Sequence, residues 1–508
     1  GVFSEFDLNG KTAGAVSVGK ADKLRQIINV GDATEDTDAV NLRQLKALKT
    51  GLESSAVHYY SVKSTDQSAG SNYKNDGAKG DNSLAAGVKA NTMSHNSVAI
   101  GMSATIKDSN GKRGSGDIAI GNNSYIDNYV DQGGSIAIGQ NARVENMAGN
   151  QERLFAFGQT TFSGYPSIPA DPSKEAGGIA IGENTFARTG SLMVGTHNYK
   201  GKLGDADIDS ANTRATGINV NATTLGTNSY NQGAFSTVTG TYSIISGKYN
   251  GSNWSLHAGQ NFGATITGSL NSIESATSSS TYSGIANSIV GVANRSFNSN
   301  GALIFGAGNE ITNSITSISA PTDGGNSAQD LQKSLMEKVK ASNSGGATLA
   351  IGGGNKADYT QASQMIGVNN TLTGTSGAIS KYNMINGYKN TAGNVSNVSV
   401  IGSENTVENA KKVILLGDKR KLTAANNSVI LGSADQTMTT DKEKVVVLGA
   451  NANSTVEGGV ALGADSVADR EGFTSAKKGV FSEFDLNGKT AGAVSVGKAD
   501  KLRQIINV

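Results

Sequence analysis

A short apolar strand that ends in glycine recurs along most of this chain, and this repeat constrains the fold more than any other feature. Such self-similarity predicts a solenoid in which each copy forms one turn. Close copies, such as those that end at Gly402 and Gly417, lie 15 residues apart. The clearest copies are residues 97–101, 117–121, 135–139 and 178–182, and weaker ones end at Gly87, Gly158, Gly195, Gly352, Gly402, Gly417, Gly432, Gly449 and Gly463.

Each copy combines the period of a strand with the signals of a corner. Val98 and Ile100 stand two apart around the small Ala99, so both lie on one face, and we predict that this face forms the core. The closing glycine, such as Gly101, supplies a positive φ or a close backbone approach at a corner. Asparagines that follow, such as Asn122, form local turn hydrogen bonds. The sequence therefore predicts strand, corner, short strand and corner in every turn.

The composition limits the core and the partners. Only 37% of the 508 residues are hydrophobic and 66 are glycine, which predicts a mainly β chain without a large globular core. The formal charge of +1 gives no reason to expect nucleic acid as a partner. The chain has no cysteine, which excludes disulfides, thiolate zinc sites and iron–sulfur clusters.

A turn of about 15 residues is too short to enclose a wide core. Each coil contributes two or three apolar side chains, so a single copy would leave much of its apolar strip in water. We therefore expect the roll to bury this strip against identical chains.

Several segments depart from the simple repeat. The pattern loosens from about residue 217, where we expect a degenerate β-roll, with disorder as the alternative. Leu331, Leu335 and Val339 lie four apart after Ser327-x-x-Asp330, which predicts a short amphipathic helix with a capping box. Insertions near residues 107–115, 145–175 and 321–346 are candidate ligand sites by position alone.

Residues 25–45 break the β pattern and lead into a helix. Leu45, Leu48 and Leu52 have the three-then-four spacing of a coiled-coil seam, although the seam is short. Fewer than two heptads cannot hold separate helices together, so this helix depends on association of the segments beside it.

The stretch RQIINV…TDAVNLRQL resembles the neck signature of trimeric autotransporter adhesins, and NSVAIG at residues 96–101 is similar to their Yersinia-adhesin-type head repeat. The residues that match the neck are Arg25, Gln26, Ile28, Asn29, Val30, Asp38, Ala39, Val40, Asn41, Gln44 and Leu45, and those that match the head repeat are Asn96, Ser97, Val98, Ile100 and Gly101.

The resemblance implies a homotrimer in which three parallel chains form a left-handed β-roll head, and the neck narrows this head into a coiled coil. It also implies a bacterial surface location, with a membrane anchor that lies outside this fragment. The implied role is adhesion to host cells, to matrix proteins such as collagen, or to other bacteria.

The first 30 residues recur without change as residues 479–508. A tandem array of head and neck modules explains this repeat, and we expect the native chain to continue after Val508 with a neck like residues 31–34; a copied segment is the alternative. The expected domains are the end of a preceding head (1–22), a neck (23–45), a short coiled coil and linker (46–64), a β-roll head with loop insertions (65–216), a degenerate β-roll (217–320), a helical insertion (321–346), a second β-roll head (347–478) and the duplicate of residues 1–30 (479–508).

We predict no catalytic residues and no cofactor. The four histidines, His58, His95, His197 and His257, have no metal-ligand spacing. Asp205, Asp207 and Asp209 resemble the start of a calcium loop but lack its glycine and its final glutamate, so a solvated loop is the default.

A tripeptide and two basic clusters also have simple structural interpretations. Lys79-Gly80-Asp81 resembles an integrin-type tripeptide, but a turn is the simpler interpretation. Lys411-Lys412 and Lys419-Arg420-Lys421 are expected in loops just beyond strands, where charges keep a solenoid soluble; a polyanion contact is the alternative.

Two other functions remain open at this stage. A glycan-processing β-helix of the phage-tailspike kind would need paired carboxylates in one groove, and no repeat position supplies them. A structural spacer within a longer fibre would have the same sequence features as an adhesin.

Overall fold

The computed structural model describes residues 14–55, 61–107, 114–128, 133–146, 177–196, 220–247, 260–276, 282–315, 318, 327–342, 347–472, 477–478, 485–486 and 490–507. The chain divides into two compact units, residues Gly1–Ser64 and Thr65–Val508. The first unit contains the helix α1 (Leu42–Ser54), and the second contains the strands and the helix α4 (Ala328–Ala341).

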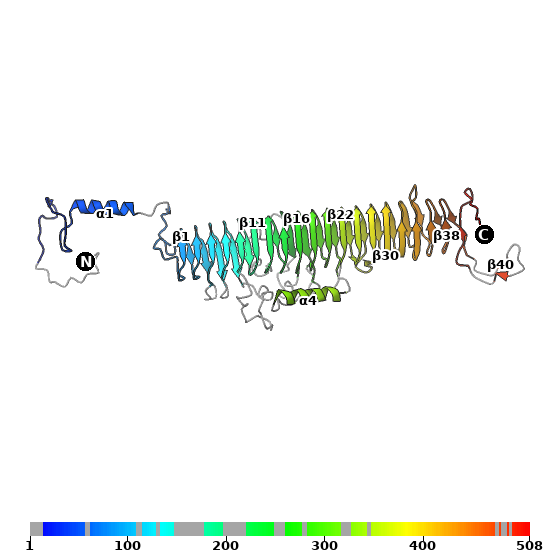
Figure 1. Cartoon of the computed structure of the whole chain (residues 1–508), viewed down its shortest axis with the longest axis horizontal. Coiled ribbons are helices and arrows are strands. Elements are labelled where there is room, and N and C mark those ends of the chain that lie inside the picture. Colours follow the sequence, from blue (N-terminus) through cyan, green and yellow to red (C-terminus); the bar gives the residue numbers. More distant parts are fainter. Residues whose placement is uncertain are drawn as a thin grey trace. The chain divides into compact units, whose positions relative to one another are not determined.

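The second unit is a β-roll in which parallel strands stack one coil upon the next (Figure 1). This confirms the predicted mainly β, parallel architecture. Strands that end at the repeated glycines form one 22-stranded sheet, here called the first sheet. Its strands are β1 (Leu84–Ala86), β3 (Val98–Ile100), β5 (Ile118–Ile120), β7 (Ile136–Ile138), β9 (Ile179–Ile181), β11 (Leu192–Thr196), β12 (Thr223–Thr227), β14 (Thr237–Thr239), β16 (Thr265–Ser269), β18 (Ser288–Val292), β20 (Leu303–Ala307), β22 (Leu349–Gly353), β24 (Thr360–Gln361), β25 (Gln364–Val368), β27 (Ser380–Lys381), β28 (Met384–Tyr388), β30 (Ser396–Ser403), β32 (Lys411–Leu416), β34 (Ser428–Leu431), β36 (Val446–Leu448), β38 (Val460–Leu462) and β42 (Val494–Ser495).

The short strands that follow each corner form the opposite wall, here called the second sheet, in three consecutive pieces. They are β2 (Asn91–Thr92), β4 (Thr105–Lys107), β6 (Tyr125–Asn128), β8 (Arg143–Asn146) and β10 (Phe186–Arg188); β13 (Tyr230–Asn231), β15 (Ile244–Gly247), β17 (Ser272–Ser275), β19 (Arg295–Phe297), β21 (Glu310–Thr312), β23 (Lys356–Asp358), β26 (Thr371–Thr373), β29 (Thr391–Gly393), β31 (Thr406–Glu408), β33 (Arg420–Thr423) and β35 (Met438–Thr440); and β37 (Asn453–Ser454) with β39 (Val467–Ala468). β40 (Lys477–Lys478) and β41 (Asp485–Leu486) form a separate antiparallel pair.

The interior of each coil lies on the face opposite to the predicted one. In β3, Ala99 is fully buried, while Val98 is half-buried and Ile100 is exposed. The prediction that Val98 and Ile100 form the core of the coil was therefore wrong for a single chain. The coil is so narrow that the small alanine fits inside it, and the two large side chains point outward.

Two inward side chains, one from each sheet, fill most coils, and they stand seven residues apart. A small residue on one wall faces a larger one on the other, as Ala119 with Ile126 and Ile385 with Ala392. Where both are large, as Met365 with Leu372, both remain fully buried. One such pair, with an added corner residue such as Ala104 or Val398 in some coils, is a thin core, and stacking of many coils makes it continuous.

The repeated glycines stack directly on one another, coil upon coil. Gly402 has φ +145°, and a Cβ added to it would lie 1.9 Å from the main-chain oxygen of Gly417. Gly101 has φ +124° and would meet Gly121 in the same way, at 2.6 Å. Both reasons predicted for the closing glycine, its positive φ and the close approach of backbone, therefore apply at these corners.

A column of buried asparagines runs beside the glycines. Asn390 donates from Nδ2 to Oδ1 of Asn370 at 3.0 Å and to the oxygen of Gly402 at 2.7 Å. Its own Oδ1 accepts from the main-chain N–H of Asn405. The same geometry repeats at Asn271, Asn294, Asn309, Asn355, Asn370, Asn390 and Asn405. These side chains connect successive coils. Asn123 and Asn141, for which we predicted local turn hydrogen bonds, also bond to the next coil, at Asn141 and Asn184.

Helix α4 confirms the predicted helix. Ser327 caps it by accepting the N–H of Asp330, and Leu331 packs into an apolar cluster with Phe262 and Ile285. Leu335 and Val339 flank the same cluster. The helix thus follows β21 in sequence but covers coils that come earlier in the chain.

The two identical 30-residue segments adopt the same local geometry where they are described. Arg25 donates from Nη1 to the oxygen of Val18 at 2.9 Å, and Arg503 donates to Val496 at 2.7 Å. In the C-terminal copy, β42 also pairs in parallel with β38, so this copy continues the first sheet.

Candidate functional site

The outward face of the first sheet carries an apolar column. Its members occupy the first and third positions around each inward residue, and they stay exposed or half-buried in the single chain. Phe305 is 55% exposed and Ile414 52%, although both belong to central strands. The column includes Val98, Ile100, Ile118, Ile120, Ile136, Ile138, Ile179, Ile181, Leu192, Val194, Leu303, Phe305, Leu349, Ile351, Ile366, Ile401, Ile414, Leu416, Val429, Leu431, Val446, Leu448, Val460 and Leu462.

An apolar face of this length is unusual on an isolated soluble chain and is typical of a surface that another protein covers. Strands of a parallel sheet usually have both faces buried. In the single chain, the outward face of the first sheet is not buried.

The neck is held by side chains of the predicted motif. Asn41 caps α1, and its Nδ2 donates to Oδ1 of Asp32 at 2.6 Å and to the oxygen of Val30 at 3.2 Å. Gln44 reaches back to Ala33, where it accepts from the N–H at 3.1 Å and donates to the oxygen at 3.0 Å. Asn41 and Gln44 together form a capping box.

Asp38 closes the turn before the helix. Its carboxylate accepts from the main-chain N–H groups of Thr34 at 2.9 Å and Glu35 at 3.0 Å. These hydrogen bonds to Thr34 and Glu35 hold the pKa of Asp38 below its usual value. The loop is therefore fixed by an ionised carboxylate.

The remaining neck residues present apolar groups to the outside of the single chain. Ile28, Val40 and Leu45 are all exposed, as are Leu48 and Leu52 of the predicted helix seam. Asn29 takes a positive φ of +56°, and Gln26 and Ala39 are exposed. The neck thus combines an internal polar network with an uncovered apolar side.

The head motif residues lie at one corner of the roll. Asn96 also has a positive φ and donates to Oγ of Ser115 at 3.0 Å. Ser97 donates to the oxygen of His95 and accepts from the N–H of Asp117, which links two successive coils. Gly101 closes the strand as described above.

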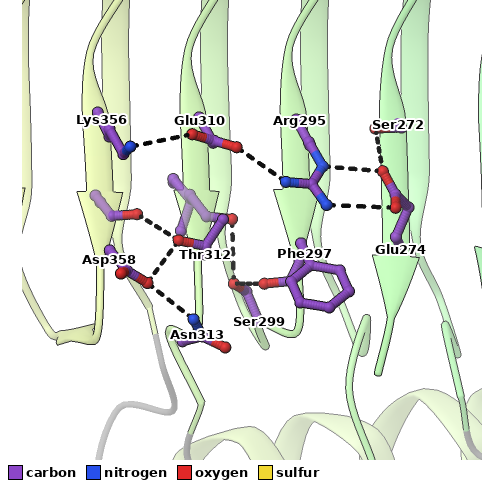
Figure 2. Close-up of polar contacts among 12 residues, drawn as sticks. Ser272, Glu274, Arg295, Phe297, Ser299, Glu310, Thr312, Asn313, Lys356 and Asp358 are labelled. Atoms are coloured by element: carbon purple, nitrogen blue, oxygen red, sulfur yellow. Dashed lines mark hydrogen bonds and ion pairs between the residues drawn. The ribbon is translucent and has the colours of Figure 1, made fainter. Parts of the chain in front are cut away.

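The outward face of the second sheet is polar and carries a row of ion pairs across four strands (Figure 2). Arg295 lies between Glu274, at 3.1 Å, and Glu310, at 2.9 Å, and Lys356 follows Glu310 at 3.9 Å. The hydrogen bond from Arg295 to Glu274 raises the pKa of the guanidinium. Asp358 accepts from Thr312 and Asn313 in the neighbouring row.

A second polar group lies on the N-terminal coils. Asp127 and Glu145 face each other in register on β6 and β8, and both are buried. Tyr125 donates to Asp127 at 2.7 Å, and Arg143 donates to Glu145 at 2.6 Å while lying over the Tyr125 ring. These carboxylates already have hydrogen-bond donors within the described part of the chain.

The histidines, the tripeptide and the aspartate triplet named in the sequence lie in different parts of the chain. His95 is described and accepts the N–H of Asp81 on Nδ1. The tripeptide that contains Gly80 packs against the next coil, because a Cβ on Gly80 would lie 2.0 Å from the oxygen of Ser94. His58, His197 and His257, the aspartates Asp205, Asp207 and Asp209, and most of the insertions at 107–115 and 145–175 lie outside the described residues.

The predicted loop location of the two basic clusters was wrong for Lys411, Lys412 and Arg420. Lys411 and Lys412 begin strand β32, and Arg420, which we predicted in an exposed loop, is fully buried. Its guanidinium donates to the oxygens of Gly432 at 2.8 Å and Ala452 at 2.7 Å. Arg420 therefore belongs to the interior column and not to a polyanion site.

Comparisons with known proteins agree with the neck geometry. Residues 26–80, which include α1 and its capping network, match the family described as the coiled stalk of trimeric autotransporter adhesin. The chain is also 35% identical over 127 residues to the autotransporter adhesin EhaG of Escherichia coli O157:H7. Both matches are to trimeric autotransporter adhesins, each over part of this chain. The match to EhaG covers 25% of this chain and 7% of that protein.

The similarity to trimeric autotransporter adhesins gives the apolar column and the uncovered neck a common explanation, which is the association of several chains. Among the described residues, no helix is both long and apolar enough to cross a bilayer.

Proposed function

We propose that this chain forms a homotrimeric fibre that attaches bacteria to host cells, to extracellular matrix or to other bacteria without catalysis. The apolar column on the first sheet carries this proposal, since three parallel chains can bury it against one another along most of the roll. The polar second sheet then faces outward in all three chains and becomes the surface that meets a receptor. The similarity to trimeric autotransporter adhesins supports the same proposal.

The assembly can be tested with one pair of substitutions in the same coil. Ile414→Asp places a charge in the column, whereas Thr423→Asp places it on the outward face of the second sheet. Light scattering at micromolar concentration should give a trimer for the parent and for Thr423→Asp, and a weakened trimer for Ile414→Asp. A monomeric parent would contradict the proposal.

Adhesion itself is tested by binding the full chain to cultured cells and to immobilised matrix proteins. We expect saturable binding that survives loss of any single carboxylate. Substitutions of surface residues, first on α4 and then in the row of ion pairs, locate the contact.

A structural spacer is the second candidate. The ion-pair row favours it, because charges that neutralise one another on the surface leave little net field to attract a ligand. No binding across a broad panel, with an intact trimer, would favour the spacer.

A glycan-processing enzyme is the third. Asp127 and Glu145 are the carboxylates to replace in that case, and release of reducing ends or unsaturated products by the parent, lost in Asp127→Asn, would support it.

A further inference from the structure

The apolar column is interrupted by polar residues in a few coils. In β28 the position that holds Ile366 and Ile401 in the neighbouring coils is Asn386. Gln364 and Ser399 occupy the other outward position one coil before and one coil after. An earlier stretch carries the outward threonines Thr223, Thr237, Thr239, Thr265 and Thr267.

Asn386 lacks the hydrogen bonds that its environment requires. Its Oδ1 is shielded from solvent yet has no partner among the described residues. This contrasts with Asn390 in the same coil, whose side chain points inward and has a full set of partners. A shielded amide oxygen without a donor is costly. Because its own chain covers Oδ1, a half-turn of the amide about χ2, which exchanges Oδ1 with Nδ2, brings the oxygen to the outward side, where a donor from another copy can reach it.

Apolar layers alone leave the alignment of the chains undetermined. Successive coils lie one strand spacing apart and present nearly the same pair of side chains. Three identical chains that slip by one coil would therefore still bury isoleucine against isoleucine over most of the column. A polar layer removes this freedom, because a slipped chain sets its Asn386 against Ile366 or Ile401 of another copy.

We propose that the Asn386 side chains of three copies meet at one level and hydrogen-bond to one another, and that this layer, with Gln364 and Ser399, fixes the register of the trimer. The inference rests on the proposed homotrimer. The partner is a second and third copy of this chain, since only identical chains in register bring the same amide to the same level. Polar residues that set register at some cost in stability are known from helical assemblies.

The absence of cysteine makes the test clean. Two chains with different tags are co-expressed, one with Ile351→Cys and one with Ile366→Cys, which lie in adjacent coils of the first sheet. After mild oxidation, disulfides between like chains report the in-register trimer, and disulfides between unlike chains report a slip of one coil. The ratio of unlike to like disulfides is the measured quantity.

The parent should give mainly like disulfides. In the variant with Gln364→Ile, Asn386→Ile and Ser399→Ile the ratio should rise roughly threefold or more, because each chain gains slipped arrangements of similar energy. The thermal midpoint of this variant should not fall, since the introduced side chains are apolar and extend the apolar column. The matched control, with Thr371→Ile, Thr391→Ile and Thr406→Ile, changes the second sheet of the same three coils and should leave the ratio unchanged.

An unchanged ratio in the triple variant would overturn the register role while leaving the trimer intact. The single variant Asn386→Ile provides a second measurement in case the triple variant folds poorly, and it should shift the ratio in the same direction. Light scattering distinguishes failure of the register role from failure of the homotrimer, because a monomeric parent would overturn the proposed homotrimer itself.

Discussion

The main-chain N–H of Arg420 donates to Oδ1 of Asn405 at 2.9 Å, so the arginine takes the next place in the column of buried asparagines. Its longer side chain reaches the oxygens of Gly432 and Ala452, one and two coils further on. The coils after it carry no asparagine at this position, and the guanidinium supplies the missing donors. Arg420 thus connects the regular part of the roll to its last coils.

Replacing Arg420 should destabilise those coils. Arg420→Ala leaves two buried main-chain oxygens without donors, which should lower the free energy of unfolding by about 3 kcal/mol. Arg420→Lys should recover only part of this loss, because an ammonium cannot match the planar fork. Urea unfolding measures both. The adjacent Lys421→Ala, which is exposed, is the control and should change little; an equal effect from both alanines would contradict the role of Arg420.

The stacked glycines predict a sharp difference between two similar substitutions. Gly402→Ala forces a Cβ to within 1.9 Å of the oxygen of Gly417 at a positive φ, and it should cost about 3 kcal/mol or more. Gly393→Ala in the neighbouring short strand meets nothing closer than Oγ1 of Thr373 at 3.6 Å, so it should be nearly neutral. Thermal unfolding of the two variants beside the parent checks this difference.

The sequence predicted the coil and its corners because both depend on local features. The two-residue spacing in residues 97–101 identifies a strand, and the glycine after it identifies a corner, whichever coil comes next. The spacing of Leu331, Leu335 and Val339 likewise identified α4. Local chemistry alone was sufficient for these elements.

Properties that depend on neighbouring coils were not predictable in the same way. Alternation in Val98-Ala99-Ile100 cannot tell the inside of the coil from its outside, since an apolar side chain suits both when a partner covers the outer face. Asparagine three residues after the glycine, as at Asn390 and Asn405, was a readable signal. We predicted turn hydrogen bonds for the asparagines directly after the glycine, such as Asn122, because turns are the usual local role of asparagine, and we did not single out the third position. Arg420 was misplaced because it stands between two lysines.

Asn390 allows that missed column to be tested directly. Asn390→Ala removes donors to Asn370 and Gly402 and the acceptor used by Asn405, and it should lower stability by about 3 kcal/mol. Asn394, in the same coil, is exposed, and Asn394→Gly keeps its positive φ accessible and should cost far less. Amide exchange should show faster opening around β29 and β31 only in Asn390→Ala. Uniform exchange in both variants would mean that the column adds no local stability.

The neck should respond to acid through Asp38. Because hydrogen bonds to Thr34 and Glu35 lower the pKa of Asp38 in the folded neck, its contribution to stability is present above the pKa of the unfolded chain, about 4, and is lost as the pH falls further. Protonation removes the charge that accepts both N–H groups, so protection of the Thr34 and Glu35 amides against exchange should decrease below that pH. Asp38→Asn should show the lower protection already at pH 7 and little further change on acidification. Asp36→Asn, in the same loop, serves as the control and should titrate like the parent. Amide protection that persists to pH 2 in the parent would mean that the helix cap at Asn41 holds the loop without the carboxylate of Asp38.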